Sequence, residues 1–515
     1  MTSHNELSAA ASVLDESSDR GLNASSTGRS RTDASLVSRG RGKPLCVDLD
    51  GTLLRTDSLI ESVLSLISDS AALGKLPRLF ATSRAAFKQR VAALAELTPE
   101  ILPFNAELLE YLREQKLKGR RIVLATAADE RTARDIVEHL ELFDDIVASN
   151  GVRNLKGEEK AKELVRLYGH KGFDYAGDSR ADLAVWRDAD GIVIVNASSV
   201  VARKARTLGN VVAEIDTRQS VVSAAIRAMR PHQWVKNLLV FVPLLASRSF
   251  FDWPGLLGSL GMFASFCATA SAIYLINDLL DLATDRRHPR KKHRPFASGT
   301  LPLPIGGVLA LALLVMGFML ALSVGAVPLL VTYAGISLTY SLWLKKYPLL
   351  DVFILAALYT VRIVAGGVAS GHLVSLWLLA FSGFTFLSLA LVKRTGELIT
   401  TTQPGSERTA TRRGYRSGDI LILQMFGVAS TFASSVVLAL FVNSSTALQE
   451  YTSPELLWGF VPLILFWQLR LWLATDRGKM HDDPIVYASR DWVSWQVAVG
   501  VVAIVLLASW GGRLW

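Results

Sequence analysis

The sequence predicts two structural parts, a water-soluble α/β domain followed by an all-α bundle of about nine transmembrane helices. Up to about residue 225, charged residues are scattered throughout the chain. After about residue 234, apolar runs of roughly 20 residues follow one another, which is the length that crosses a bilayer. In the first part, short apolar strands alternate with helical segments, a pattern typical of a parallel sheet.

The composition agrees with this division. The chain has 515 residues, 50% of them hydrophobic, and a formal net charge of +9. Because the basic residues cluster in short loops between apolar runs, membrane topology explains the charge and nucleic acid is not an expected partner. Cys46 and Cys267 form neither a disulfide framework nor a CxxC pair. Residues 1–42 lack periodic apolar residues and the apolar core of a secretory signal, so a disordered tail is expected.

The soluble domain is expected at 43–215, with a linker at 216–233 before the membrane domain at 234–515. Strands are predicted at the start of this domain and at three later positions: 43–54, 121–129, within 173–186, and 191–198. Most of 58–115 and all of 157–169 read as helix. The predicted membrane spans are 235–248, 256–279, 304–323, 326–344, 349–370, 374–392, 420–442, 455–474 and 493–511. The first of these is short and fits a tilted or interfacial segment.

Lysine and arginine counts set the predicted orientation. The basic residues fall in the loops after the second, fourth, sixth and eighth spans, whereas the loops on the other side hold Arg248, with Arg513 in the tail. Basic loops stay on the cytoplasmic side. We therefore expect a multi-pass protein of a bacterial inner membrane, with the soluble domain and basic loops in the cytoplasm and the C-terminus in the periplasm.

Four carboxylates follow predicted strands of the soluble domain. Asp48 and Asp50 lie in the segment DLDGT at 48–52, and Asp178 and Asp182 follow a later strand. Ligands of open α/β sheets bind at the carboxyl ends of the strands, so these groups are expected to lie together. Such an oxygen-rich set suits Mg²⁺, and a carboxylate nucleophile beside it can attack phosphorus.

Over about 43–215 these motifs, in order, resemble the haloacid dehalogenase (HAD) superfamily of phosphatases. The resemblance implies that Asp48 is the nucleophile and Asp50 the acid/base. It also implies that Asp178 holds Mg²⁺, with Asp182 in support and Asp48 and Asp50 contributing to the same metal site. The alternatives are that the acidic residues are ordinary loop caps or that the domain is vestigial.

Two further residues complete the implied HAD site. By the same resemblance, Thr126 binds the phosphoryl group and Lys160 balances its charge, although Lys156 stays open as the functional lysine. The stretch of about 58–100, between the first two motifs, is expected to form a small helical cap.

The membrane part carries a second acidic cluster, NDLLDLATD at 277–285, followed by arginine, histidine and lysine residues. Asn277, Asp281 and Asp285 are four residues apart and therefore share one helix face, with Asp278 beside them. Carboxylates at a membrane helix end are costly unless they are functional. Mg²⁺ bound to a diphosphate is the expected partner. The alternative is a charged helix end anchored by basic side chains that reach the interface.

The pattern NDxxDxxxD resembles the UbiA superfamily of intramembrane prenyltransferases, over about 227–515. The resemblance implies that Asp281 and Asp285 are catalytic and bind Mg²⁺ with Asn277 and Asp278. Family members carry a second aspartate-rich motif after the sixth span, where this chain has the basic segment VKRTGEL. This departure, with RPHQWVKN, YSLWLKK and VRIVAGGVASG elsewhere, resembles the decaprenyl-phosphate phosphoribosyltransferase branch.

That branch attaches phosphoribose from phosphoribosyl diphosphate (PRPP) to a polyprenyl phosphate. Lysine and arginine suit the additional 5-phosphate of PRPP. The candidates for these contacts are Lys236, Lys345, Lys393 and Arg394, with Asn277 also at the substrate. For each basic residue a purely topological role stays open.

The interpretation that joins both parts is a two-step enzyme: transfer of 5-phosphoribose to the lipid, then removal of the 5-phosphate by the HAD domain. One rival is a prenyltransferase with an aromatic or other small acceptor, and another is a membrane protein with an inactive site. The sequence does not set the lipid's chain length, the phosphatase substrate or whether the chain forms a homo-oligomer.

Overall fold

The computed structural model describes residues 42–68, 84–95, 97–150, 153–247, 249, 251–401, 414–480 and 483–510. Apart from Gly42, the tail predicted for 1–42 lies outside these ranges. Residues 43–515 belong to one compact unit.

A six-stranded sheet forms the centre of the first domain, in the order β3-β2-β1-β4-β5-β6. All five strand pairs are parallel, which confirms the predicted α/β class. The strands are β1 (Leu45–Val47), β2 (Ile122–Asp129), β3 (Asp145–Ser149), β4 (Asp174–Gly177), β5 (Gly191–Val195) and β6 (Asn210–Ile215). The sequence patterns did not predict β3 and β6, since β6 has no buried residue and β3 is only partly buried.

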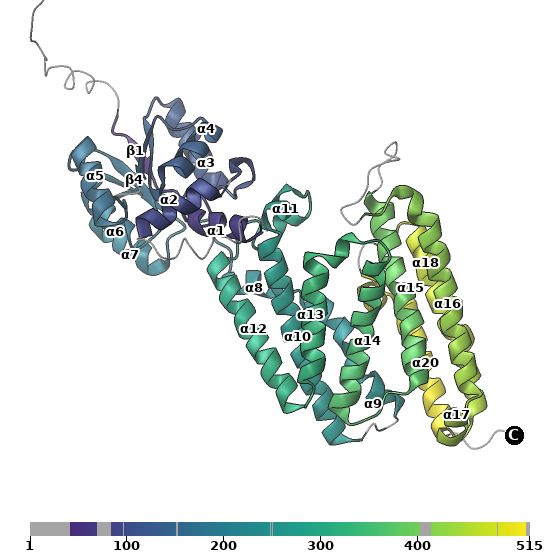
Figure 1. Cartoon of the computed structure of the whole chain (residues 1–515). Coiled ribbons are helices and arrows are strands. Elements are labelled where there is room, and N and C mark those ends of the chain that lie inside the picture. The colour runs from purple at the N-terminus through teal and green to yellow at the C-terminus, as the bar shows by residue number, and fades with distance from the viewer. Residues whose placement is uncertain are drawn as a thin grey trace, which may run out of the picture. The chain divides into compact units, whose positions relative to one another are not determined.

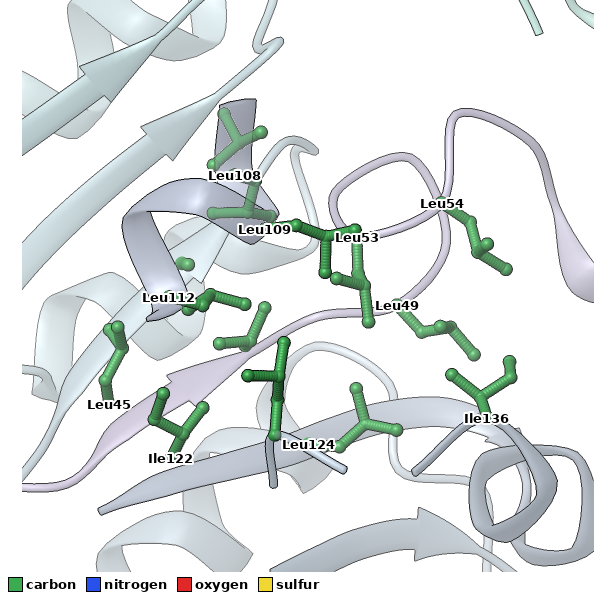
Figure 2. Close-up of a cluster of buried hydrophobic side chains, with 14 of the residues drawn as sticks. Leu45, Leu49, Leu53, Leu54, Leu108, Leu109, Leu112, Ile122, Leu124 and Ile136 are labelled. Atoms are coloured by element: carbon green, nitrogen blue, oxygen red, sulfur yellow. The ribbon is translucent and has the colours of Figure 1, made fainter. Parts of the chain in front are cut away.

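Helices cover both faces of this sheet (Figure 1). They are α3 (Ala106–Leu117), α4 (Glu130–Leu140), α5 (Glu158–Tyr168), α6 (Asp182–Asp188) and α7 (Ser199–Leu208). Successive side chains of a strand point to opposite faces of the sheet. Leu45 and Val47 therefore pack with α3 and α4, whereas Cys46 packs with α5, α6 and α7. Figure 2 shows the first of these layers, where leucines of β1, its following loop and α3 meet Ile122 and Leu124. The two layers hold the carboxyl end of β1 in a fixed position.

The predicted cap is helical where it is described. It comprises α1 (Ser58–Ser68), α2 (Arg84–Leu94) and the 3₁₀ helix η2 (Pro99–Ile101). Residues 69–83 of the predicted cap lie outside the described ranges.

The second domain is helical throughout its described length (Figure 1). Its first elements are α8 (Val221–Met229), the 3₁₀ helix η3 (Pro231–Phe241), α9 (Val242–Ala246), α10 (Trp253–Leu280), α11 (Leu282–Arg287), η4 (Lys291–His293), α12 (Leu303–Ser323) and α13 (Val327–Leu342). They are followed by η5 (Leu344–Lys346), α14 (Leu350–Ser370), α15 (Leu376–Thr401), η6 (Ser417–Asp419), α16 (Ile420–Val442), α17 (Ser445–Glu450), η7 (Pro454–Gly459), α18 (Phe460–Asp476), α19 (Pro484–Arg490) and α20 (Trp492–Trp510).

Seven helices in the described ranges are long and apolar enough to cross a membrane, and α13 is a shorter apolar helix. The predicted count of nine spans is therefore approximate. The described part of the first predicted span, 235–247, contains the end of the 3₁₀ helix η3 and the five-residue α9, and α9 is too short to cross a bilayer. Pro243, at the start of α9, lacks the backbone N–H that one continuous helix through η3 and α9 would need.

Close packing holds η3 against the bundle. A Cβ atom added to Gly366 on α14 would lie 2.0 Å from the backbone oxygen of Val240, so a glycine is needed for this approach. Helix α10 packs against α12, α13 and α14. Between η3 and α14, Arg362 donates a hydrogen bond of 2.8 Å to the buried Asn237.

Candidate active sites

The acidic residues of the soluble domain meet at the carboxyl end of β1, between β2 and β4. This is the position where the strand order reverses, and open α/β sheets bind ligands there. Asp48, Asp178 and Asp182 each place a carboxylate oxygen within 4.8 Å of the others. Gly51 has a φ of 82°, and a Cβ atom at this position would lie 2.4 Å from Asp178 Oδ2. Only glycine allows the two loops to approach so closely.

Lys160 lies directly beside the predicted nucleophile. Its ammonium group is 2.8 Å from Asp48 Oδ1 and donates a hydrogen bond of 2.8 Å to the Tyr175 hydroxyl. Lys156, which the sequence left open as an alternative, is exposed and lines a neighbouring cavity. Thr126 is fully buried, and its Oγ1 accepts a hydrogen bond from the backbone of Ala128. The structure thus brings Lys160 rather than Lys156 to Asp48.

Burial raises the pKa values of two carboxyl groups of this site, Asp48 and Asp178. The pKa of Asp48 rises to about 6, because burial and the charge of Asp182 outweigh the opposing charge of Lys160. The pKa of Asp178 rises to about 8, through burial and the charges of Asp182 and Asp48. These three oxygen donors crowd together at a cost that a divalent cation would relieve, so the donor set fits Mg²⁺.

Asp50 and Asp182 have different surroundings. Burial and the nearby charge of Asp57 raise the pKa of Asp50 to about 7, although its Oδ1 accepts a hydrogen bond of 2.7 Å from the backbone of Ser58. A carboxyl group with a pKa near neutrality suits proton transfer. The oxygens of Asp182 accept hydrogen bonds from the Tyr175 hydroxyl, the Ser179 hydroxyl and two backbone amides. These contacts fit a supporting role for Asp182.

The acidic segment of the membrane domain keeps its helical spacing across the junction of α10 and α11. The backbone amide of Asp281 donates to the backbone oxygen of Asn277, and the backbone amide of Asp285 donates to the backbone oxygen of Asp281. Both hydrogen bonds measure 2.8 Å. Asn277 also donates a side-chain hydrogen bond of 2.9 Å to Ser341. The predicted four-residue spacing is therefore maintained in the backbone.

Basic side chains pair with these carboxylates. Arg230 lies 2.6 Å from Asp278, and Arg294 bridges Asp278 at 3.0 Å and Asp285 at 2.6 Å. Lys345 lies 3.7 Å from Asp281.

One oxygen at this site lacks a hydrogen bond. Within the described residues, Asp285 Oδ1 is buried and has no hydrogen-bond partner, the Lys291 ammonium group being 3.9 Å away. An acceptor left in this state fits a cation that arrives with the substrate.

Two of the predicted phosphate-binding lysines meet at one buried carboxylate. Asp483, just before α19, lies 2.7 Å from Lys236 and 3.1 Å from Lys393. The Tyr359 hydroxyl also donates to Asp483. Although burial alone would raise the pKa of Asp483, the two lysines hold it well below its usual range. Four segments distant in sequence therefore join in one polar cluster.

The fourth basic candidate, Arg394, lies elsewhere and is fully buried. Its guanidinium is 2.6 Å from Asp351, which is also buried, and it forms a second ion pair with Glu397. The Tyr415 hydroxyl donates to the same Asp351. These contacts favour a structural role for Arg394, holding α14 to α15.

Sequence reasoning missed two residues of the membrane domain. Asp483 carries no motif, although an aspartate next to a proline in a loop after a span was a weak signal. Arg362, in the middle of α14, is buried and donates hydrogen bonds to Asn237 and to the Tyr333 hydroxyl. A buried arginine at this depth is costly, which was a usable signal within the segment VRIVAGGVASG.

Comparisons with known proteins identify both domains. A profile described as haloacid dehalogenase-like hydrolase matches residues 45–187, and one described as UbiA prenyltransferase family matches 238–484. Fold and sites thus define a polytopic membrane transferase with a hydrolase-like domain. The chain belongs to the UbiA prenyltransferase family and carries a HAD-like domain ahead of the membrane bundle.

Three relatives extend this picture. The chain is 37% identical to the uncharacterized protein y4nM of Sinorhizobium fredii over 476 residues, which is 91% of each chain. It is 37% identical to the nodulation protein NoeC of Azorhizobium caulinodans, over 51% of this chain and 86% of that protein. It is 31% identical to a decaprenyl-phosphate phosphoribosyltransferase of Mycolicibacterium smegmatis, over 53% of this chain and 88% of that protein. The resemblance of the membrane domain to this transferase branch is therefore confirmed.

Proposed function

We propose that the membrane domain transfers 5-phosphoribose from PRPP to a polyprenyl phosphate, and that the HAD domain then removes the 5-phosphate from the lipid product. The observation that carries this proposal is the pairing of an acidic motif, Asn277 to Asp285, with basic side chains from three other segments. Such a site suits a substrate with several phosphoryl groups. The similarity to decaprenyl-phosphate phosphoribosyltransferases supports it.

In the first step, a phosphate oxygen of the lipid attacks C1 of the ribose, the bond from C1 to the diphosphate oxygen breaks, and diphosphate leaves. Arg294, shared by Asp278 and Asp285, would balance the charge that grows on the leaving group. Lys345, near Asp281, would bind the same diphosphate, whereas Lys236 and Lys393 would bind the 5-phosphate.

In the second step, Asp48 attacks the 5-phosphorus and the bond between phosphorus and O5 breaks. Asp50 gives its proton to O5 and then takes one from the water that releases inorganic phosphate from Asp48. Thr126 and Lys160 would hold the phosphoryl oxygens, and the 2.8 Å contact of Lys160 with Asp48 supports this.

Mg²⁺, when bound, would neutralise phosphoryl oxygens at both sites. The residues that would hold it are Asn277, Asp278, Asp281 and Asp285 in the membrane domain, and Asp48, Asp50, Asp178 and Asp182 in the soluble domain.

A direct contact supports the coupling of the two steps. Glu61 on α1 accepts hydrogen bonds of 3.0 and 2.6 Å from Arg286, and both side chains are about 5% exposed. Asp50 contacts the start of α1 through Ser58, and Arg286 directly follows Asp285. A short tether between two sites raises the effective concentration of the shared intermediate, to the order of millimolar.

The test supplies the purified full chain with radiolabelled PRPP and a polyprenyl phosphate, and then analyses the lipid product for sugar and phosphate. We expect ribose without the 5-phosphate from the wild type, and ribose 5-phosphate on the lipid from Asp48→Asn. Label that never enters the lipid phase contradicts the transfer step. A fully phosphorylated lipid from the wild type contradicts the second step alone. Transfer of a prenyl group to an aromatic acceptor would favour the rival prenyltransferase function.

We also propose that the HAD domain and the basic loops face the cytoplasm of a bacterial inner membrane. The test uses a membrane-impermeant thiol reagent, against which the buried Cys46 and Cys267 give a low background. A cysteine at Ser445, an exposed position, should be labelled from the periplasm, whereas one at Ser298 should not. Labelling of Ser298→Cys from outside would reverse the topology.

A further inference from the structure

The HAD site opens into a cavity that extends beyond its reacting carboxylates. This cavity has a volume of about 370 Å³ and lies between the cap and the sheet. It is larger than a single phosphoryl group requires and falls in the range of small-molecule pockets. Its wall includes Asp50, the cap residues Leu59, Phe87 and Lys88, and the core residues Asn154 and Lys156.

Lys88, on cap helix α2, presents a positive charge to this cavity. Its ammonium group donates to the backbone oxygen of Ala127 at 2.8 Å and to Asn154 Oδ1 at 3.3 Å. Both acceptors are neutral, and a lysine has a third hydrogen to donate. Partial burial lowers the pKa of Lys88, against the opposing charges of Asp50 and Asp57. An anion beside this ammonium group would offset the cost of its burial.

A second lysine lines the same cavity from the core side. Lys156 is exposed there, whereas Lys160 forms an ion pair with Asp48. In the part of the chain that the structure describes, no carboxylate lies within ion-pair distance of Lys88 or Lys156.

The two other acidic residues of the cavity wall, Asp57 and Asp129, already accept hydrogen bonds from backbone amides. Asp57 Oδ1 accepts from the backbone amides of Leu59 and Ile60 at the start of α1. Asp129 Oδ1 accepts from the amide of Arg131 and caps α4. Within the described residues neither carboxylate forms an ion pair with Lys88 or Lys156, so the cavity keeps two cations beyond the position of the reacting phosphate.

We propose that Lys88 and Lys156 form a second anion subsite, which binds a phosphate group on the same sugar as the phosphate to be hydrolysed. The substrate class is a sugar phosphomonoester with a further phosphate ester at its other end. This inference deepens the proposed function and rests on it for the source of the sugar, because the phosphodiester that joins ribose to the lipid has this chemistry. A soluble sugar bisphosphate has the same chemistry.

The test compares two soluble substrates, ribose 1,5-bisphosphate and ribose 5-phosphate, using the full chain with Mg²⁺. We expect the wild type to prefer the bisphosphate in kcat/KM, and Lys88→Met to lower that preference about tenfold. Lys88→Arg, which keeps the charge, should retain most of it. Because the result is a ratio, a loss of folded protein affects both substrates equally. An exposed lysine outside the cavity, Lys204 on α7, gives the matched control Lys204→Met, which should keep the wild-type ratio.

An unchanged ratio in Lys88→Met overturns the subsite. If neither substrate is turned over, the same ratio is measured as dissociation constants with the Asp48→Asn variant, and equal constants for the two sugars overturn it as well. A third arm uses the ribosylated lipid with its 5-phosphate. Preference for the bisphosphate without action on this lipid keeps the subsite but assigns it to a soluble substrate, and the lipid step of the proposed function then fails separately.

Discussion

The two acidic sites of this protein differ in how their negative charges are balanced by nearby cations. In the soluble domain, Asp48, Asp178 and Asp182 crowd within 4.8 Å of one another, with Lys160 as the nearby cation. In the membrane domain, arginine or lysine side chains already pair with Asp278, Asp281 and Asp285. Burial raises the pKa values of Asp48 and Asp178, so protonation can relieve the repulsion at the first site. An unpaired charge inside a bilayer costs more, so the second site is neutralised before its substrate arrives.

The largest expected effect comes from the membrane site. Asp285→Ala should lower phosphoribosyl transfer about 100-fold or more, since the proposed role of Asp285 is to hold the Mg²⁺ that would neutralise the leaving diphosphate. Hydrolysis of a small phosphate ester by the HAD domain should continue. Both rates are measured on the same purified sample.

The control for this variant is Asp252→Ala, at the opposite end of α10 from the acidic motif. Its transfer rate should stay within about twofold of the wild type, because the ion pair of Asp252 with His372 lies at the far end of α10 from the acidic motif. Near-normal transfer by Asp285→Ala would remove the metal assignment in the membrane domain.

The second prediction concerns charge pairing as a stabilising device. Asp351→Leu removes the buried one of the two carboxylates that pair with Arg394 and should destabilise the fold by about 3–5 kcal/mol. Thermal unfolding in detergent measures this as a lower Tm. The double variant Asp351→Leu with Arg394→Met should recover most of the loss. A double variant as unstable as the single one would show that shape rather than charge is decisive.

In the soluble site, by contrast, the loss of a carboxylate charge should stabilise the fold. Without Mg²⁺, Asp178→Asn should raise the Tm of the chain's HAD domain by about 5 °C at pH 8, since it removes a buried charge from a crowded site. The pKa of Asp178 is about 8 in the folded chain, above its unfolded value of about 4. Wild-type stability is therefore lost as the pH rises from about 4 to 8. The stabilisation by Asn should shrink toward pH 5.

Mg²⁺ should reverse the order of the Tm values of the wild type and Asp178→Asn. It should raise the Tm of the wild type more at pH 8 than at pH 6, because protons compete for the same carboxylates. Asp178→Asn should respond weakly at both values. Equal Mg²⁺ responses of the two proteins would contradict the metal site.

The smallest effect is expected at Lys393. Lys393→Ala should raise the KM for PRPP about tenfold with a smaller change in kcat, since a lost phosphate contact weakens ground-state binding. Lys346→Ala, in a neighbouring basic loop, is the control and should leave KM within about twofold. If Lys393→Ala uses PRPP normally, its charge serves topology alone.

The sequence by itself determined the two domain classes, because apolar runs and strand periodicity are local properties. It also located the carboxylates of both sites: DLDGT follows β1, and Asp178 follows β4, as predicted. In the membrane domain, the four-residue spacing from Asn277 to Asp285 survived the break between α10 and α11.

Tertiary structure decided what local patterns could not. It selected Lys160 over Lys156, it joined Lys393 and Tyr359 to Asp483 across 90 and 124 residues, and it paired Arg394 with Asp351. It also made 235–246 a 3₁₀ helix and a short α-helix packed onto α14 instead of a span. The physical reason is that the partner of a buried charge is set by helix packing and by the cost of leaving that charge unpaired. Neither quantity can be read from the neighbours of a residue in the chain.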